Sequence, residues 1–203
     1  MVHDQSLHDR LYDNLSVHPR LSGEDRDLRH AAVAVAVIDD DRGRACYLLT
    51  RRAPTLRVHS GQWALPGGRV DPGENAVEAA CRELDEELAV TRVEVLGSLD
   101  DYSTRSGYRI TPVVLWVAPG TSVTPSPDEV AEVHRVPLTE LERDDAPQLV
   151  EFEESDRPII RMPMGDRWIN APTAAMLYQF REVALHGRTT RVAHYEQPRF
   201  AWK

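Results

Sequence analysis

The chain has 203 residues, of which 41% are apolar and 28% charged, a composition typical of a globular protein with a buried core. Its net charge of −9 argues against a protein that coats nucleic acid, because phosphate neutralisation requires a basic surface. The sequence has no apolar run of transmembrane length and no signal-peptide pattern, and its two cysteines lack the spacing of a zinc or disulfide motif. We therefore expect a cytoplasmic protein of one domain, or one domain with an added arm, and no membrane partner.

Residues 1–30 are polar and predict a short helical arm that packs on the body or on a partner. Its apolar residues recur at helical spacing: Leu7, Leu11, Tyr12 and Leu15. Residues 31–38 form an apolar run of strand length, and a turn leads from it to a hairpin partner at residues 45–51. Residues 61–68 predict a short strand that enters a glycine turn, where glycine permits close backbone approach to a ligand.

Beyond residue 90 we expect mainly short strands. They lie at residues 92–99, 109–117 and 129–136, then as a hairpin of 157–164 and 166–170. A helical turn at 137–141 and an acidic surface loop at 144–155, with a short strand at 148–152, separate them. A helix at 172–185 starts with proline in its first turn and buries one stripe: Ala175, Met176, Gln179, Phe180 and Val183. The sequence leaves open whether the polar tail from residue 186 is docked, disordered or dimer-forming.

The segment 68–90 contains the strongest helix signal of the chain. Asn75 followed by Glu78 predicts a capping box, and no glycine or proline interrupts residues 76–88. The expected buried face consists of Val77, Ala80, Cys81, Leu84 and Leu88. Beside it Glu83, Glu86 and Glu87 fall within an arc of about 100°. Three carboxylates at the C-terminal half of a helix repel one another and the macrodipole, so the pattern alone leaves two readings open: a solvated acidic face, or a site for a hard divalent cation.

The spacing of this segment resembles the signature box of the Nudix hydrolases. Gly68, Glu74, Arg82-Glu83-Leu84 and Glu86-Glu87 stand at the positions of the family box, and Ala89 stands where the family has glycine. The resemblance implies an α/β protein with the Nudix fold, an α/β/α sandwich around a mixed sheet. It divides the chain into an arm at 1–30, a Nudix domain at 31–187 and a tail at 188–203. The departure at Ala89 has two possible explanations. Either the turn that ends the helix does not need a left-handed backbone conformation there, or alanine adopts that conformation at a cost in stability.

Carried over by position, the resemblance implies that Glu83, Glu86 and Glu87 bind Mg²⁺ or Mn²⁺. Glu86 or Glu87 would also be the catalytic base that takes a proton from the attacking water. Outside the box, Asp128, Glu129 and Glu132 are further candidates for that base. We expect Gly68, Glu74 and Arg82 to support the ligands, with Arg82 pairing with a box carboxylate and orienting it.

The residues before the box resemble the motif of the coenzyme A diphosphatases within this family. Leu48-Leu49-Thr50-Arg51-Arg52-Ala53, then Arg57, Gly61 and Leu65-Pro66-Gly67-Gly68 follow that motif, except that Leu65 replaces its phenylalanine. The resemblance implies hydrolysis of coenzyme A to 3′,5′-ADP and a 4′-phosphopantetheine. Because guanidinium groups match phosphate oxygens, Arg52 and Arg57 are the candidate substrate contacts.

Other functions of the same fold stay open at this point. The substrate could be ADP-ribose or a nucleoside triphosphate, including an oxidised one, or the protein could bind a nucleotide without cutting it. Sensors of that kind commonly lack the metal carboxylates, whereas this chain has all three. We expect a small nucleotide as partner, and the resemblance makes a homodimer possible.

Overall fold

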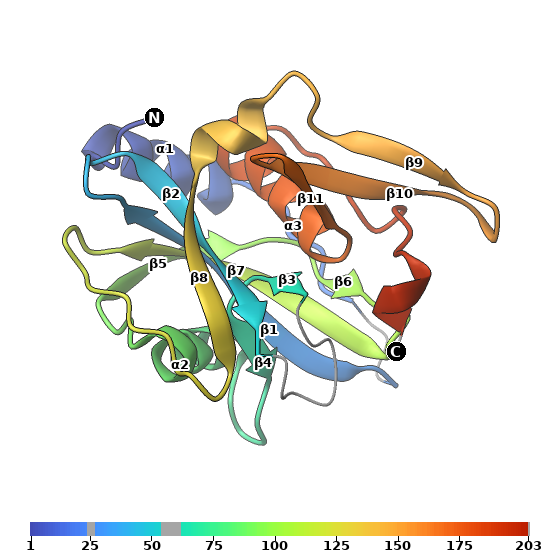
Figure 1. The fold of residues 1–203 in the computed structure, drawn as a ribbon, viewed down its shortest axis with the longest axis horizontal. Coiled ribbons are helices and arrows are strands. Elements are labelled where there is room, and N and C mark those ends of the chain that lie inside the picture. The colour runs from blue at the N-terminus through green and yellow to red at the C-terminus, as the bar shows by residue number, and fades with distance from the viewer. Residues whose placement is uncertain (24–26, 54–61, 203) are drawn as a thin grey trace.

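The computed structural model describes residues 1–23, 27–53 and 62–202. It shows a mixed β-sheet with helices on both sides and a smaller three-stranded sheet beside it (Figure 1). The fold is the expected α/β class. Arg57, a candidate substrate contact, lies outside the described residues. Among the helices that are described, none is long and apolar enough to cross a bilayer.

The main sheet is built around β1 (Arg29–Asp39), the strand predicted from the apolar run. β1 pairs in parallel with β7 (Tyr108–Val117) and antiparallel with β2 (Ala45–Arg52) and β4 (Gly67–Arg69). The remaining strands extend it on either side: β3 (Trp63–Ala64), β5 (Val93–Ser98), β6 (Tyr102–Ser103) and β8 (Val130–Pro137). The parallel β1–β7 pair makes the sheet mixed, because the other pairs are antiparallel.

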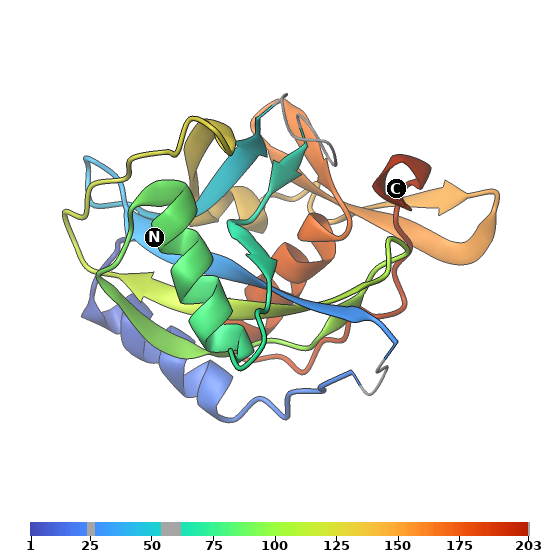
Figure 2. The same ribbon diagram turned by 90° about the horizontal axis from the view of Figure 1, so that it is seen from below.

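The side chains of β1 alternate between two hydrophobic cores, one on each face of the sheet. Ala32, Ala34 and Ala36 pack with α2 (Ala76–Leu88) on one face. Val33, Val35 and Val37 pack on the other face with α1 (Gln5–Ser16) and α3 (Thr173–Phe180). Figure 2 shows α2 on one side of the sheet, with α1 and α3 on the other. A strand covered on both faces reads as a continuous apolar run, which explains the sequence pattern.

Helix α2 begins and ends where the sequence predicts. The Asn75 side chain accepts from the backbone of Val77 and Glu78, and the Glu78 side chain accepts from the Asn75 backbone, which completes the capping box. Ala89 ends the helix in the left-handed region at φ 55°. The turn that ends the helix therefore does use a left-handed residue, and it accepts alanine in a conformation that glycine adopts more easily.

The buried face of α2 differs from the predicted one at four positions. Val77 and Cys81 are only half-buried, whereas Ala79 and Glu87 are buried. The face turned toward the sheet is therefore shifted around the helix axis toward Glu87. An amphipathic pattern does not predict a buried carboxylate, because a glutamate is counted with the solvent face.

The second sheet carries the C-terminal part of the chain. It consists of β9 (Gln148–Phe152), β10 (Ser155–Met164) and β11 (Arg167–Asn170), after a 3₁₀ helix at Leu138–Glu142. The β9–β10 hairpin projects from the body in Figure 1. α3 continues as a π-helical turn (Arg181–Leu185), and the predicted stripe of five residues is buried. The tail is docked, and it ends in a 3₁₀ helix at Arg199–Trp202 whose Trp202 ring packs edge-on against Phe152.

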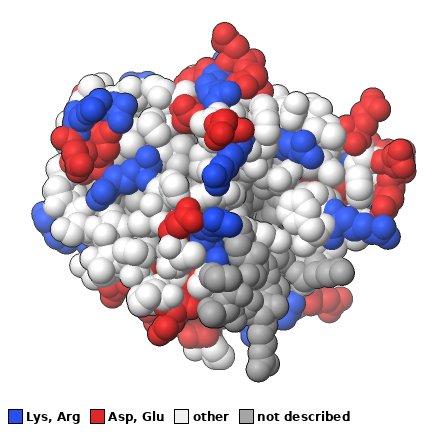
Figure 3. Space-filling view, viewed as in Figure 1, with Lys and Arg blue, Asp and Glu red and all other residues white. Residues whose placement is uncertain are grey.

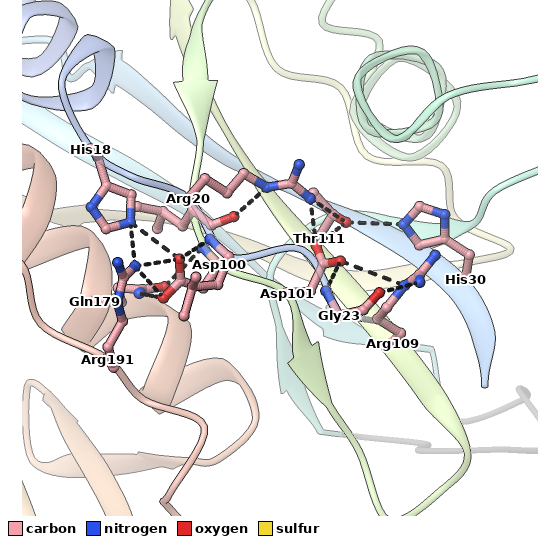
Figure 4. Close-up of polar contacts among 12 residues, drawn as sticks. His18, Arg20, Gly23, His30, Asp100, Asp101, Arg109, Thr111, Gln179 and Arg191 are labelled. Atoms are coloured by element: carbon pink, nitrogen blue, oxygen red, sulfur yellow. Dashed lines mark hydrogen bonds and ion pairs between the residues drawn. The ribbon is translucent and has the colours of Figure 1, made fainter. Parts of the chain in front are cut away.

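Asp100 forms hydrogen bonds with two segments that are far apart in the sequence, one near each end of the chain. The polar segment after α1 and the segment after α3 converge on this carboxylate (Figure 4). It accepts hydrogen bonds from the Leu21 backbone at 2.8 Å, from Gln179 at 2.7 Å and from Arg191 at 2.7 Å. Burial alone would raise the pKa of Asp100, but these donors hold its pKa below the ordinary value of 3.8. The folded protein therefore stabilises the ionised carboxylate.

Replacing Asp100 with Asn is expected to destabilise the protein at neutral pH by about 2–3 kcal/mol. A fully buried pair would cost about 3–5 kcal/mol, but Arg191 is 31% exposed, which screens the charge. A lowered folded pKa gives stability that is present above the unfolded value and lost as pH falls through the folded one. In urea unfolding, the difference between wild type and variant should be largest at pH 7 and shrink below about pH 3.8. An equal difference at pH 7 and pH 3 would contradict this account.

Candidate active site

The box residues meet where β4 turns into α2. Arg82 is the centre of the arrangement, and its guanidinium donates to the Glu74 carboxylate from Nε at 2.9 Å and Nη2 at 3.0 Å. Its Nη1 donates at 2.9 Å to both Glu83 and Glu86, and Nη2 also donates to the Arg69 carbonyl at 3.0 Å. Arg82 thus joins three carboxylates to the backbone of β4, and it lies beside box carboxylates as the sequence suggested.

Glu83 lies against the backbone of Gly68. A Cβ atom added at Gly68 would overlap the Glu83 carboxylate, with Oε2 only 2.7 Å away. No other residue type leaves room for this carboxylate in its present position. Burial raises the pKa of Glu83, and the hydrogen bond from Arg82 opposes that rise. Gly68 therefore supports the site by leaving space.

Glu87 is the most deeply buried carboxylate of the box, with 3% of its side chain exposed. Desolvation raises its pKa to about 8, against the opposing effects of Arg52 and a hydrogen bond from the Gly67 backbone. Among the described residues, the guanidinium nearest to Glu87 is that of Arg52, 3.9 Å away. A glutamate that is buried with so little compensation is costly for the fold alone, so its environment is typical of a functional group.

Glu86 faces solvent instead, and 54% of its side chain is exposed. In the described part of the chain, no three acidic, histidine or cysteine side chains are grouped closely enough to hold a metal ion as they stand. Arg82 lies between Glu83 and Glu86, to both of which it donates. The carboxyl groups nevertheless suit a hard cation, because Glu83 and Glu87 are both desolvated and the charge of Glu83 adds to the rise in the pKa of Glu87.

The candidates for a base outside the box differ in their surroundings. Glu129 precedes β8, and its charge acts on both Glu83 and Glu87. Glu132 instead pairs with Arg51 at 2.9 Å and with His134 at 3.2 Å, so its carboxylate is engaged on the surface of the sheet. Asp128 is exposed in the loop before β8. Of the three, only Glu129 is shown to act on the box carboxylates.

A cleft of about 560 Å³ adjoins the box. Gly67, Gly68 and Arg52 line the cleft, and Arg52 also lies 3.9 Å from Glu87. Its walls are largely apolar or aromatic and come from distant parts of the sequence: Trp63, Leu65, Ile110, Trp168, Ile169, Met176 and Phe200. On the face that Figure 3 displays, basic and acidic side chains are interspersed, without a broad basic surface.

The sequence analysis did not identify the walls of this cleft. Trp168 belongs to β11, and Phe200 belongs to the C-terminal 3₁₀ helix. Phe200 is 54% exposed and lines the cleft, so its ring is open to a ligand there. The sequence shows three aromatic residues in the tail, Tyr195, Phe200 and Trp202, but nothing in their spacing places any of them beside the box.

Comparison with known proteins identifies the family. The family model of the NUDIX domain matches residues 28–161. The chain is 44% identical over 115 residues to the uncharacterized Nudix hydrolase NudL of Photorhabdus laumondii, over 55% of this chain and 60% of that protein. It is 41% identical over 130 residues to NudL of Citrobacter koseri, over 63% and 67% respectively. The chain thus aligns with about 60 to 67% of the length of these relatives.

A solved structure with the same kind of domain is the Nudix hydrolase RenU of M. smegmatis. It is 26% identical, with a TM-score of 0.47, over 56% of this chain and 73% of that one. Enzymes of this family act on small nucleotides and generally use divalent metal ions. The family match spans most of the chain, including the whole of the box, and the chain is therefore a member of the Nudix hydrolase family.

Proposed function

We propose that the protein hydrolyses the diphosphate bridge of a nucleoside diphosphate linked to another group, and that this substrate is coenzyme A or one of its thioesters. The observation that carries the proposal is the buried Glu87 carboxyl group, which lies 3.9 Å from Arg52 and accepts from the Gly67 backbone, two residues that line the cleft. A buried anion beside a guanidinium and an open cleft suits a site that holds a cation and an anionic substrate together.

The residues of the box divide the work. Mg²⁺ or Mn²⁺, held by Glu83, Glu86 and Glu87, would neutralise the bridge and lower the pKa of the attacking water. Arg82 keeps Glu83 and Glu86 in place, and Glu74 in turn orients Arg82 through two hydrogen bonds. Glu87 is the better placed of the two box candidates for the base, because it is shielded from solvent and lies next to Arg52, which lines the cleft, whereas Glu86 is exposed. Arg52 would contact the phosphate oxygens.

The cleft supports coenzyme A over the alternatives. Its apolar and aromatic walls suit a long, weakly polar arm such as pantetheine better than a second charged nucleotide. ADP-ribose and nucleoside triphosphates remain the alternative substrates, and a non-cleaving nucleotide sensor is the alternative from another class. The retained carboxylates favour an enzyme over the sensor.

The test is product analysis after parallel incubation of the purified protein with coenzyme A, ADP-ribose, NADH and a nucleoside triphosphate. Each substrate is supplied with Mg²⁺ and with Mn²⁺. We expect 3′,5′-ADP and 4′-phosphopantetheine from coenzyme A at the highest kcat/KM. A clear preference for a nucleotide without pantetheine rejects the substrate, and inactivity toward all of them together with tight nucleotide binding supports the sensor.

Replacing Arg82 with Lys is expected to weaken metal binding about tenfold or more. Every donor position of the guanidinium is used, and an ammonium cannot reproduce contacts to Glu74, Glu83 and Glu86 at once. Activity at limiting Mn²⁺ should fall, and saturating Mn²⁺ should restore part of it. A metal titration like that of wild type would refute the orienting role of Arg82.

A further inference from the structure

A second cationic group lies at the rim of the cleft, separate from Arg52. Arg69 follows Gly68 on β4, and its guanidinium donates to the Tyr108 hydroxyl from Nε at 3.2 Å and from Nη2 at 3.1 Å. The Arg29 guanidinium lies over the Tyr108 ring, with its carbon 4.1 Å from the ring centre. Tyr108 thus contacts two guanidinium groups: its hydroxyl accepts hydrogen bonds from Arg69, and its ring stacks with Arg29.

The pairing of the strands explains why these three residues meet. Arg69 lies opposite Ala31 in the antiparallel β1–β4 pair, and Arg29 lies beside Tyr108 in the parallel β1–β7 pair. Side chains two residues apart on a strand point to the same face, so Arg29 shares the face of Ala31. Ala31, Arg69 and Tyr108 all line the cleft. The cationic group is therefore directed to the cleft side of the sheet.

The polar partners of these guanidiniums are neutral. Arg69 donates to the Tyr108 hydroxyl, and Arg29 donates to the Ser106 carbonyl at 3.0 Å. Within the described residues, no ion pair involves Arg29 or Arg69, whereas most other arginines near carboxylates are paired. Two arginines whose charge is not neutralised, in a chain of net charge −9, favour an anionic ligand at this rim.

We propose that Arg69, Arg29 and Tyr108 bind a phosphate monoester carried on the ribose of the substrate, apart from the diphosphate that is cut. This inference rests on the proposed function in that a nucleotide occupies the cleft. Arg69 stands two residues beyond Gly67, whose backbone donates a hydrogen bond to Glu87, so both residues border the cleft from the short strand β4. One nucleotide can therefore reach both ends of this strand, and the planar fork of arginine matches a terminal phosphate.

A purely structural role is the competing explanation, since the Arg29–Tyr108 stack also closes the end of the sheet. The two roles have different consequences. A structural role would change thermal stability without changing the choice between ligands. A phosphate subsite would change that choice, because only the ligand with the additional phosphate reaches the guanidiniums. Arg82 donates to the backbone carbonyl of Arg69, not to its side chain, so replacing the Arg69 side chain leaves this hydrogen bond of the box in place.

The experiment compares adenosine 3′,5′-bisphosphate with adenosine 5′-monophosphate by isothermal titration calorimetry in the presence of Mg²⁺. The proteins are wild type, Arg69→Gln, Arg29→Gln and Arg69→Lys. Arg10→Gln is the matched control, since Arg10 is exposed on α1 and does not line the cleft. We expect wild type and Arg10→Gln to prefer the bisphosphate roughly ten- to a hundredfold, as charge-assisted hydrogen bonds allow.

In Arg69→Gln and Arg29→Gln this preference should fall below about threefold, and Arg69→Lys should recover part of it. Retention of the full preference in both glutamine variants overturns the subsite, even if coenzyme A is hydrolysed. A wild-type preference below about threefold overturns it as well. If the preference is present and lost as expected while coenzyme A is not cleaved, the proposed substrate fails and the subsite stands.

Discussion

Replacing Glu87 with Gln is expected to lower kcat for diphosphate hydrolysis by at least about 100-fold, because a positioned acid or base contributes roughly 10²–10⁴. The same side chain is a proposed metal ligand, so Mn²⁺ affinity should fall as well. The fold should not suffer, since a neutral amide costs less to bury than a carboxylate whose charge is offset by Arg52 at 3.9 Å and by one backbone hydrogen bond. Steady-state kinetics, Mn²⁺ titration and thermal unfolding measure the three effects.

Asp85→Asn is the matched control for this variant. Asp85 lies on the same helix and is exposed. The Asp85→Asn variant makes the same change from a carboxyl group to an amide at a residue that does not line the cleft. Its kinetics should resemble those of wild type. Glu87→Gln with wild-type kcat and metal affinity would remove Glu87 from both proposed roles and leave its burial without a functional explanation.

Replacing Gly68 with Ala is expected to reduce activity about 10- to 100-fold with little loss of stability. The added Cβ would displace the Glu83 carboxylate, which would then lose its position beside Arg82. The displaced atoms are the end of a flexible side chain rather than backbone, so the chain can adjust at a cost of about 1 kcal/mol. Kinetics at varied Mn²⁺, together with urea unfolding, separate the two effects.

Gly43→Ala serves as the control, because it is expected to lower stability without lowering activity. Gly43 has φ +72°, and a Cβ there meets no atom within 4 Å. The variant should lose about 1–2 kcal/mol from backbone strain and keep its activity. If Gly68→Ala retained full activity, the place of Glu83 beside the β4 backbone would not matter for the reaction.

The helix of the box could be predicted from sequence to the residue, because its signals are local. Asn75 and Glu78 act within one turn, and the absence of glycine and proline up to Leu88 sets the helix length. The same holds for β1, whose apolar run reflects burial on both faces. Arg82 was assigned a partner among the box carboxylates, and the structure places it beside Glu83 and Glu86.

What the sequence could not predict depends on long-range packing. The burial of Glu87 follows from the position of α2 on the sheet, which shifts the buried face away from Val77 and Cys81. The cleft brings Trp63, Trp168 and Phe200 together from three separate segments. The cationic group at Tyr108 depends on strand register, which no local pattern reveals.

The residues that line the cleft come partly from inside and partly from outside the segment that matches the family model. Its hydrolytic edge, with Gly67 and Gly68, lies inside the segment common to the family at residues 28–161, whereas Trp168, Met176 and Phe200 lie beyond that segment. One wall of the cleft is thus supplied from outside the family segment, while the box and the arginines proposed to contact phosphate lie within it. On the proposed function, mutations after residue 161 are expected to change how the apolar part of a substrate is accepted while the box is left intact.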